Sequence, residues 1–461
     1  MHSFTSLKQQ LALLVLRYLR FFARRQLRRH PDLHIIGVTG SAGKSSTRDA
    51  IYQVLRQAGT VKASFKANSE SGIPLDILNL TMRNYSLLDW ARVLLLCPWQ
   101  LLTSRIAADF YVVEMGIDSP DSPKNMEFLL SIVRPRDGVF TSAGPNHAAA
   151  FDHLVPRSAS PEQRRQRITQ LIATEKAKLI ASLPKTGLAL LNADDREVLA
   201  ATRRAKARTL TFGQSAGADL RLLKHQLTLT TARGQQHPSL QSRFTFAWQS
   251  KKIQLSFTDL FLPAHYAYSL APAILLGLEQ GLSLAVIKQA LETGWRPPAG
   301  RASVFGGRQH SLIIDSSYNA SSMLDFITSL KDLRLRKGRK LALLGDMREL
   351  GQSSKSLHQR LALSIDDSFS EIHLVGPAML EYALPILEKN SHLQVFHHPS
   401  STQAGQVLRQ RLQAGDLLLV KGSQNTIFLE EAIKKCLAKP KQDQGKLCRQ
   451  QEFWLQQKQL T

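Results

Sequence analysis

The sequence is poor in cysteine and has no long hydrophobic run. Its three cysteines, Cys97, Cys436 and Cys448, are far apart and odd in number, a pattern that favours a reducing compartment and argues against a disulfide framework. No uninterrupted apolar stretch approaches the ~20 residues that a helix needs to span a bilayer. The apolar start, residues 11–22, is interrupted by arginines and lacks a small-residue cleavage site, so we expect no cleaved signal peptide.

Acidic residues are also scarce. The chain has 60 Lys and Arg against 36 Asp and Glu, a net charge of +24, which indicates attraction to nucleic acid, the inner membrane face or a phosphorylated substrate. No RNA-recognition signature or zinc finger is present, which argues against specific nucleic-acid recognition. Residues 1–33 predict a basic amphipathic helix that lies either on an anionic membrane or on the protein's own core. Residues 86–105 predict a second apolar helix, either in the core or facing a membrane.

The strongest motif is a glycine-rich turn between an apolar strand and a helix. Glycines let backbone N–H groups approach an anion, and the start of a helix adds positive potential. In this reading Lys44 reaches the β- and γ-phosphates of a nucleotide and the Ser45 hydroxyl holds Mg²⁺. The usual spacing would place the first glycine at Val38, so this loop is a variant. The predicted nucleotide-binding residues are Gly40, Ser41, Ala42, Gly43, Lys44, Ser45 and Ser46.

Strands that alternate with helical stretches predict an α/β fold with parallel sheets. We expect a P-loop central ATPase domain, with a mostly parallel sheet plus a small antiparallel sheet, followed by a Rossmann-like C-terminal α/β domain. The predicted boundaries are a basic N-terminal helix at 1–33, the central ATP-binding domain at 34–298, the C-terminal domain at 299–440 and a polar tail at 441–461.

Five side chains outside the loop are candidates for chemistry, and each has a structural alternative. Glu114, at a predicted strand end, supplies a carboxylate for Mg²⁺ or an ordinary ion pair. His147 ligates a second metal, contacts phosphate, or is a turn or surface residue, and Lys176 is by default a solvated lysine. Asp315 binds a ribose or orients a substrate, and Arg301 reaches a phosphate or is an exposed linker residue. Spacing alone therefore predicts a two-domain, Mg²⁺-dependent, nucleotide-using enzyme without naming its substrate.

The order of the motifs adds a resemblance to a known family. From about residue 34 to 435 the chain is similar to the Mur ligases, which form amide bonds with ATP, and within them to the branch that adds D-alanyl-D-alanine to a UDP-linked muramyl tripeptide. The matching segments are 37–45, 113–116, 141–147, 175–179, 191–195, 300–301, 314–320, 344–351, His358 and 420–423.

The resemblance implies a reaction and roles. ATP phosphorylates a carboxylate to an acyl phosphate, an amine attacks it, and ADP and phosphate leave with a muramyl-peptide product of peptidoglycan synthesis. Ser45 and Glu114 would hold one Mg²⁺, and His147 with a carbamylated Lys176 would hold a second. The implied catalytic residues are Lys44, His147, Lys176, Arg301 and Asp315. Further implied nucleotide contacts are Asn192, His265, Arg301 and Asp315, and implied substrate contacts are Tyr318, Asn319, Asp346 and Lys421.

The chain also departs from that branch. Only about 33 residues precede the loop where the usual N-terminal UDP-sugar-binding domain is expected, so a lipid-linked or otherwise altered acceptor stays open. Ser269 stands where the family has Asn, and 321–322 are Ser-Ser instead of Asn-Pro. The alternatives are another Mur-type ligase, such as a folylpolyglutamate or cyanophycin-like synthetase, or a non-catalytic nucleotide-binding protein at the membrane. We expect a cytoplasmic monomer, with peripheral contact to anionic membrane through residues 1–30.

Overall fold

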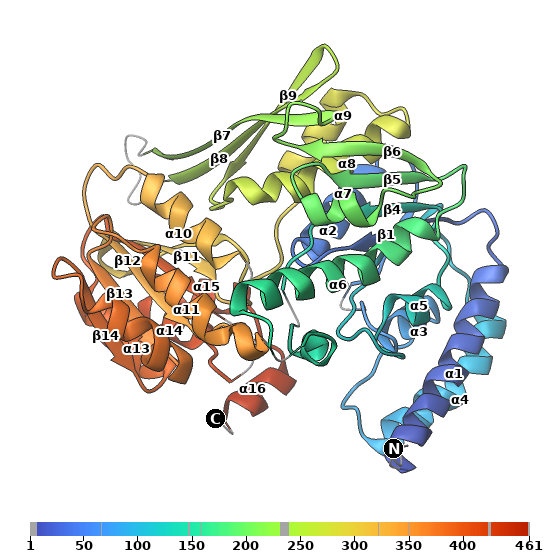
Figure 1. The fold of residues 1–461 in the computed structure, drawn as a ribbon, viewed down its shortest axis with the longest axis horizontal. Coiled ribbons are helices and arrows are strands. Elements are labelled where there is room, and N and C mark those ends of the chain that lie inside the picture. The colour runs from blue at the N-terminus through green and yellow to red at the C-terminus, as the bar shows by residue number, and fades with distance from the viewer. Residues whose placement is uncertain are drawn as a thin grey trace. The chain divides into compact units, whose positions relative to one another are not determined.

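The computed structural model describes residues 7–65, 67–145, 148–156, 158–230, 239–320, 322–348, 350–422 and 426–459 (Figure 1). The chain divides into two compact units. The first comprises Met1–Arg157, Gln166–Arg221 and Tyr268–Trp295, and the second comprises Ser158–Arg165, Leu222–Ala267 and Arg296–Thr461. Each contains a parallel sheet with helices, which confirms the predicted α/β fold class.

The first unit is built on a parallel sheet in the order β2-β3-β1-β4-β5-β6, with the start of β7 pairing to β6. Its inner strands are almost entirely buried, as parallel strands covered on both faces must be, and they read as continuous apolar runs. Because the strands are parallel, their carboxyl ends share one edge, where ligands of such sheets bind. The strands are β1 (His34–Thr39), β2 (Val61–Ala63), β3 (Phe110–Glu114), β4 (Asp137–Phe140), β5 (Leu188–Asn192), β6 (Arg208–Gly213) and the first two residues of β7 (Leu220–Thr230), the rest of which belongs to the second unit.

Helices surround this sheet (Figure 1). The helix after the glycine-rich turn, α2, is fixed at its first turn because the Trp295 indole N–H donates to the Ser46 carbonyl at 2.9 Å. No helix within the described ranges combines the length and apolarity that crossing a bilayer requires. The helices are α1 (Leu7–Arg28), α2 (Lys44–Leu55), α3 (Gly72–Ile77), α4 (Leu87–Thr103), α5 (Met126–Leu130), α6 (Pro161–Ala181), α7 (Arg196–Ala201), α8 (Ala267–Glu279) and α9 (Leu284–Gln289).

The second unit contains a sheet in the order β10-β11-β15-β12-β13-β14, in which only β10 runs antiparallel to its neighbour. It also contains the antiparallel pair β8 (Ser239–Trp248) and β9 (Lys251–Thr258). The other strands are β10 (Ser303–Gly306), β11 (Leu312–Ser316), β12 (Lys340–Gly345), β13 (Glu371–Val375), β14 (Gln394–His398) and β15 (Leu417–Lys421). The helices are α10 (Met323–Asp332), α11 (Ser354–Leu363), α12 (Leu384–Leu387), α13 (Ser401–Arg411), α14 (Glu430–Cys436), α15 (Pro440–Asp443) and α16 (Glu452–Gln459).

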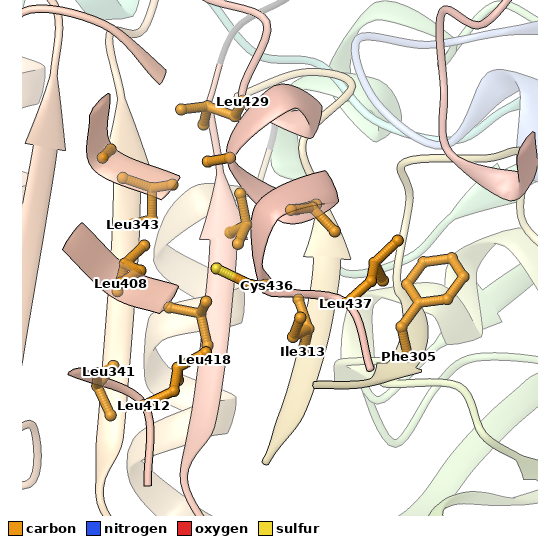
Figure 2. Close-up of a cluster of buried hydrophobic side chains, with 14 of the residues drawn as sticks. Phe305, Ile313, Leu341, Leu343, Leu408, Leu412, Leu418, Leu429, Cys436 and Leu437 are labelled. Carbon is orange, nitrogen blue, oxygen red and sulfur yellow. The ribbon is translucent and has the colours of Figure 1, made fainter. Parts of the chain in front are cut away.

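The core of the second unit lies between this sheet and helices α13 and α14. Figure 2 shows leucines of β12 and β15 facing apolar side chains of the two helices. The helices approach closely at Gly405, where an added Cβ would stand 2.6 Å from the Cα of Ala432. Cys436 lies in this core as a free thiol, and burial raises its pKa to about 12. The labelled members are Phe305, Ile313, Leu341, Leu343, Leu408, Leu412, Leu418, Leu429, Cys436 and Leu437.

Candidate active site

The glycine-rich turn follows β1 and leads directly into α2. Gly40 has φ 152°, and a Cβ there would fall 2.0 Å from the Thr141 hydroxyl. Gly43, which precedes the first residue of α2, has φ 80°, in the left-handed region that side-chain-bearing residues avoid. Both glycines are therefore required by the backbone, and the helix begins with its N–H groups next to the loop, as an anion-binding turn needs.

The segment after β4 braces this loop. The Ser41 N–H donates to the Ser142 carbonyl at 2.8 Å, and the Ala42 N–H donates to the Ser142 hydroxyl at 3.0 Å. The Thr141 hydroxyl donates to the Ala42 carbonyl at 2.6 Å. Asn192, at the end of β5, donates from its amide to the Thr141 carbonyl at 2.8 Å. Three adjacent strands thus hold one loop in place, and Asn192 supports the loop through this segment.

Lys44 is the first residue of α2, after the loop that follows β1, and Glu114 is the last residue of β3, the neighbour of β1 in the sheet. The Lys44 ammonium donates to the Gly40 carbonyl at 2.8 Å, within its own loop. Glu114 pairs in register with Val38 of β1, and its carboxylate accepts from Arg48 at 3.1 Å and from the Asn68 amide at 3.2 Å. The ion-pair alternative for Glu114 is therefore realised, by a buried arginine that the sequence reading did not single out.

The two lysines of the 175–179 motif have different environments. Lys178 is part-exposed and pairs with Glu175 at 2.7 Å. Lys176 is 3% exposed, and burial, reinforced by the positive charge of Lys44, holds its pKa well below the ordinary value, against the attraction of Asp118, Glu114 and Glu175. Lys176 is thus not the solvated lysine of the default reading.

A second cluster of predicted residues lies in the second unit, at the ends of β11 and β15. One Asp315 oxygen accepts from the N–H and hydroxyl of Ser317, at 3.0 and 2.6 Å, and burial raises the Asp315 pKa to about 6. Lys421 donates to the Ser316 hydroxyl and to the Asn319 carbonyl, both at 3.1 Å. Burial first, and then Arg301, lower the Lys421 pKa to about 7.

Arg301 and Tyr318 lie together in this cluster. The Arg301 guanidinium stacks 4.8 Å from the centre of the Tyr318 ring, a cation–π distance. The Asp315 Oδ2 and Arg301 Nε atoms are buried and have no hydrogen-bond partner among the residues that the structure describes. Since buried polar atoms are normally paired, these two atoms are exceptions that keep unused hydrogen-bonding capacity.

Three predicted residues are engaged in local contacts. Asp346 accepts from the N–H groups of Ala378 and Met379, at 3.2 and 2.8 Å, and so caps a helical turn. His358 accepts from the Met347 N–H at 3.0 Å, which holds the residue after Asp346. His265 lies 3.2 Å from the Asp325 carboxylate. His147 lies outside the described residues.

Sequence reasoning missed one residue of the second cluster, Arg449. Its side chain is 1% exposed and pairs with the buried Glu430. It also donates to the Ser317 and Tyr318 carbonyls, at 3.1 and 3.2 Å, and so supports the turn after β11. Residues 441–461 were predicted as a polar tail, and no local signal marks one arginine among their charges.

The first unit has a braced phosphate loop at the edge of a parallel sheet, and near this loop lie a buried carboxylate and a buried lysine of lowered pKa. These features define a nucleotide-dependent enzyme of the α/β class. Family models agree with this class. The Mur ligase middle domain matches residues 38–155 and 166–264, and the Mur ligase glutamate ligase domain matches residues 300–424. The chain belongs to the Mur ligase family and is an ATP-dependent ligase that forms C–N bonds.

Individual relatives and solved structures are similar to the chain over most of its length. The UDP-N-acetylmuramoyl-tripeptide–D-alanyl-D-alanine ligase of Synechocystis is 26% identical over 88% of this chain and 74% of its own length. The MurF ligase of Thermotoga maritima, solved with ADP, superposes with a TM-score of 0.65 at 21% identity, covering 91% of this chain and 83% of that one. A mutant of FPGS from L. casei superposes with a TM-score of 0.54 at 17% identity, covering 92% and 93%. At such identities the solved structures show the fold alone.

Proposed function

We propose that this ligase joins D-alanyl-D-alanine, or a similar amine, to the free carboxylate of a muramyl tripeptide in peptidoglycan precursor synthesis. The observation that carries the proposal is the alignment over 88% of the chain with a ligase of that name, together with an intact phosphate loop. The γ-phosphoryl group of ATP passes to a carboxylate oxygen and ADP leaves. The amine then attacks the carbonyl carbon of the acyl phosphate, the C–O bond to phosphate breaks, and the amine loses a proton.

In this proposal the first unit holds the nucleotide. Of the loop residues Gly40 to Ser46, those at the start of α2 direct backbone N–H groups at the phosphates, while the Ser41 and Ala42 N–H groups stay bound to Ser142 and brace the loop. Lys44 exchanges its bond to the Gly40 carbonyl for phosphate oxygens. Mg²⁺ fits the residues present, because the Ser45 hydroxyl and the Glu114 carboxylate are hard oxygen ligands. When bound, Mg²⁺ would neutralise charge on the transferring phosphoryl group. When no Mg²⁺ is bound, the ion pair with Arg48 balances the charge of the Glu114 carboxylate.

Lys176 is the second part of this site. A lysine whose pKa lies well below the ordinary value has a neutral amine fraction that can add to CO₂, giving a carbamate anion and a proton. The carbamate would supply an anionic oxygen ligand where a lysine would otherwise repel a metal. Lys178 lacks this environment, since it is part-exposed and paired with Glu175. We propose that His147 is a further ligand of the second metal ion, which the carbamylated Lys176 would also bind.

The second unit carries the remaining proposed contacts. The Arg301 Nε and Asp315 Oδ2 atoms, which have no hydrogen-bond partner among the described residues, would form hydrogen bonds with the nucleotide. Lys421, whose pKa is about 7, donates to the Asn319 carbonyl and so positions this segment for contact with a substrate. We assign Asn192 and His265 to the nucleotide and Tyr318 and Asp346 to the substrate. We further propose that the enzyme works in the cytoplasm as a monomer, with peripheral contact at the inner membrane face through residues 1–30.

A phosphate-release assay with ATP, Mg²⁺, a UDP-linked muramyl tripeptide and D-alanyl-D-alanine tests the proposal. Release must require both the tripeptide and the amine, and it must fall at least 100-fold in Lys44→Ala, since removal of one transition-state contact has about that effect. Unchanged release in Lys44→Ala would refute the site. The fold shared with FPGS favours one rival, a ligase for another amino acid. If glutamate replaces D-alanyl-D-alanine with higher kcat/KM, this rival is correct.

A further inference from the structure

Helices α1 and α4 pack side by side and leave their outer faces uncovered (Figure 1). Leu19 of α1 packs with Val93 and Cys97 of α4 in one buried cluster. The Tyr18 hydroxyl donates to the Leu94 carbonyl at 3.0 Å, and the Gln26 amide donates to the Ser104 carbonyl at 2.8 Å. On each helix the exposed side chains lie opposite those buried in this cluster, and we term these two exposed sides together the α1/α4 face.

Large apolar residues dominate the α4 half of this face, and the one basic residue of α4, Arg92, has a 30% exposed side chain and pairs with Asp89. Leu88, Leu95, Trp99 and Leu102 are 83, 79, 61 and 75% exposed and follow one another at helical spacing. The single acid of α4, Asp89, is buried and accepts from three backbone N–H groups, so it does not interrupt the stripe. Stripes of large exposed apolar residues are rare on monomeric surfaces without a partner.

The α1 half adds positive charge. Its exposed residues Leu14, Phe21, Arg25 and Arg28 lie on one line along the helix, apolar toward its start and basic toward its end. The Arg25 guanidinium lies 4.7 Å from the centre of the Phe21 ring. No Asp or Glu occurs among residues 1–31, which contain seven Lys and Arg. The α1/α4 face thus combines apolar side chains with positive charge that no acid of α1 itself offsets.

We propose that the α1/α4 face docks onto an anionic lipid bilayer, with the α4 leucines and Trp99 inserted and the α1 arginines at the headgroups. A membrane satisfies both halves of the face at once, because acyl chains accept the apolar stripe and anionic headgroups accept the arginines. Tryptophan suits the boundary between them. This surface is wider than residues 1–30, and its inserting element is α4. The proposal depends on the first unit alone and is independent of the ligase substrate.

Vesicle flotation of the full chain tests the docking. We expect binding to phosphatidylcholine vesicles that contain phosphatidylglycerol, weakened by salt, and little binding to phosphatidylcholine alone. The double variant Leu95→Ser, Trp99→Ser should lower the partition coefficient at least tenfold, since each side chain loses its burial in lipid. Arg25→Gln with Arg28→Gln should lower it about 30-fold on anionic vesicles. Leu363→Ser, which changes a 74% exposed leucine of α11, is the matched control and should bind like the unmodified chain.

Fluorescence quenching distinguishes insertion of α4 into the bilayer from electrostatic attraction to the bilayer surface. Brominated lipids should quench the fluorescence of Trp99, and the quenching should be lost in Trp99→Phe. The docking is refuted if the chain does not float with anionic vesicles, or if the α4 variant and the Leu363→Ser control float equally. A dimer that the α4 variant dissociates, without flotation, would refute it in favour of a second copy of the chain. Phosphate release without vesicles should be unchanged in all these variants, so failure of the docking and failure of the ligase assay are distinguishable.

Discussion

Lys421 gives the most quantitative prediction of the structure. The residue is 1% exposed, and its ammonium donates to the Ser316 hydroxyl and the Asn319 carbonyl and lies 4.4 Å from the centre of the Phe326 ring. Its pKa is lowered from 10.5 to about 7 in the fold, mainly by burial. In the unfolded chain the lysine keeps its proton up to its ordinary pKa near 10.4. The folded state therefore binds fewer protons than the unfolded state between these two values.

The sign and size of the effect follow from this difference. Since the unfolded state holds the extra proton, stability rises with pH by about 1.4 kcal/mol per pH unit in this window. From pH 7, where the folded lysine is half protonated, to pH 10, Lys421 should add about 3 kcal/mol to the free energy of unfolding. Below pH 7 the cost of burying the charge is fully present.

Lys421→Met isolates this contribution because it removes the charge and keeps the side-chain length. Urea denaturation at pH 7 and pH 10, on the variant and the unmodified chain, gives four free energies of unfolding, and groups that titrate in both proteins cancel. Between pH 7 and pH 10, we expect the free energy of unfolding of the unmodified chain to rise by about 3 kcal/mol more than that of the Lys421→Met variant. Lys389→Met, at an exposed lysine, should show no such difference. Equal pH dependence of the Lys421→Met variant and the unmodified chain would refute the buried-charge account.

Three further predictions concern other buried contacts. Lys176→Met should lower phosphate release at least 100-fold and abolish a carbamate signal from ¹³C-bicarbonate in NMR, whereas Lys178→Met should stay within a few-fold of the unmodified enzyme; equal effects of the two would contradict the assignment. Arg449→Met should lower the free energy of unfolding by about 3 kcal/mol in urea titrations, because Glu430 loses a partner in the core, and adding Glu430→Gln should recover part of it. Gly405→Ala should lower the unfolding midpoint by forcing α13 from α14, a cost of about 1–3 kcal/mol.

Local motifs explain why part of the site could be predicted. The glycines at 40 and 43 and the lysine that follows occur within one turn, so their chemistry is readable from neighbours in the sequence. Glu114 ends a strongly apolar strand, and parallel pairing with β1 brings it to the loop edge as expected. The two-sheet α/β fold follows from the same alternation of strands and helices, and the structure confirms it.

Tertiary contacts explain what could not be predicted. Lys176 and Lys178 are two positions apart on one helix, and only packing buries the first and leaves the second part-exposed. Arg449 finds its partner Glu430 through a fold in the chain that no local pattern records. The apolar sequence of α4 is compatible with a core helix, which it favours, or with a membrane-facing one, and only the structure shows that Leu95 and Trp99 are exposed.

Transfer of oxygen from the acceptor to phosphate tests the central claim most directly. If the chain activates a muramyl-tripeptide carboxylate as an acyl phosphate, an acceptor labelled with ¹⁸O in that carboxylate must deliver one ¹⁸O atom to each phosphate released as D-alanyl-D-alanine is joined. Mass spectrometry of the phosphate and of the peptide product measures both. We predict one labelled oxygen per amide formed. Unlabelled phosphate, or labelled phosphate without the amide product, would contradict the account.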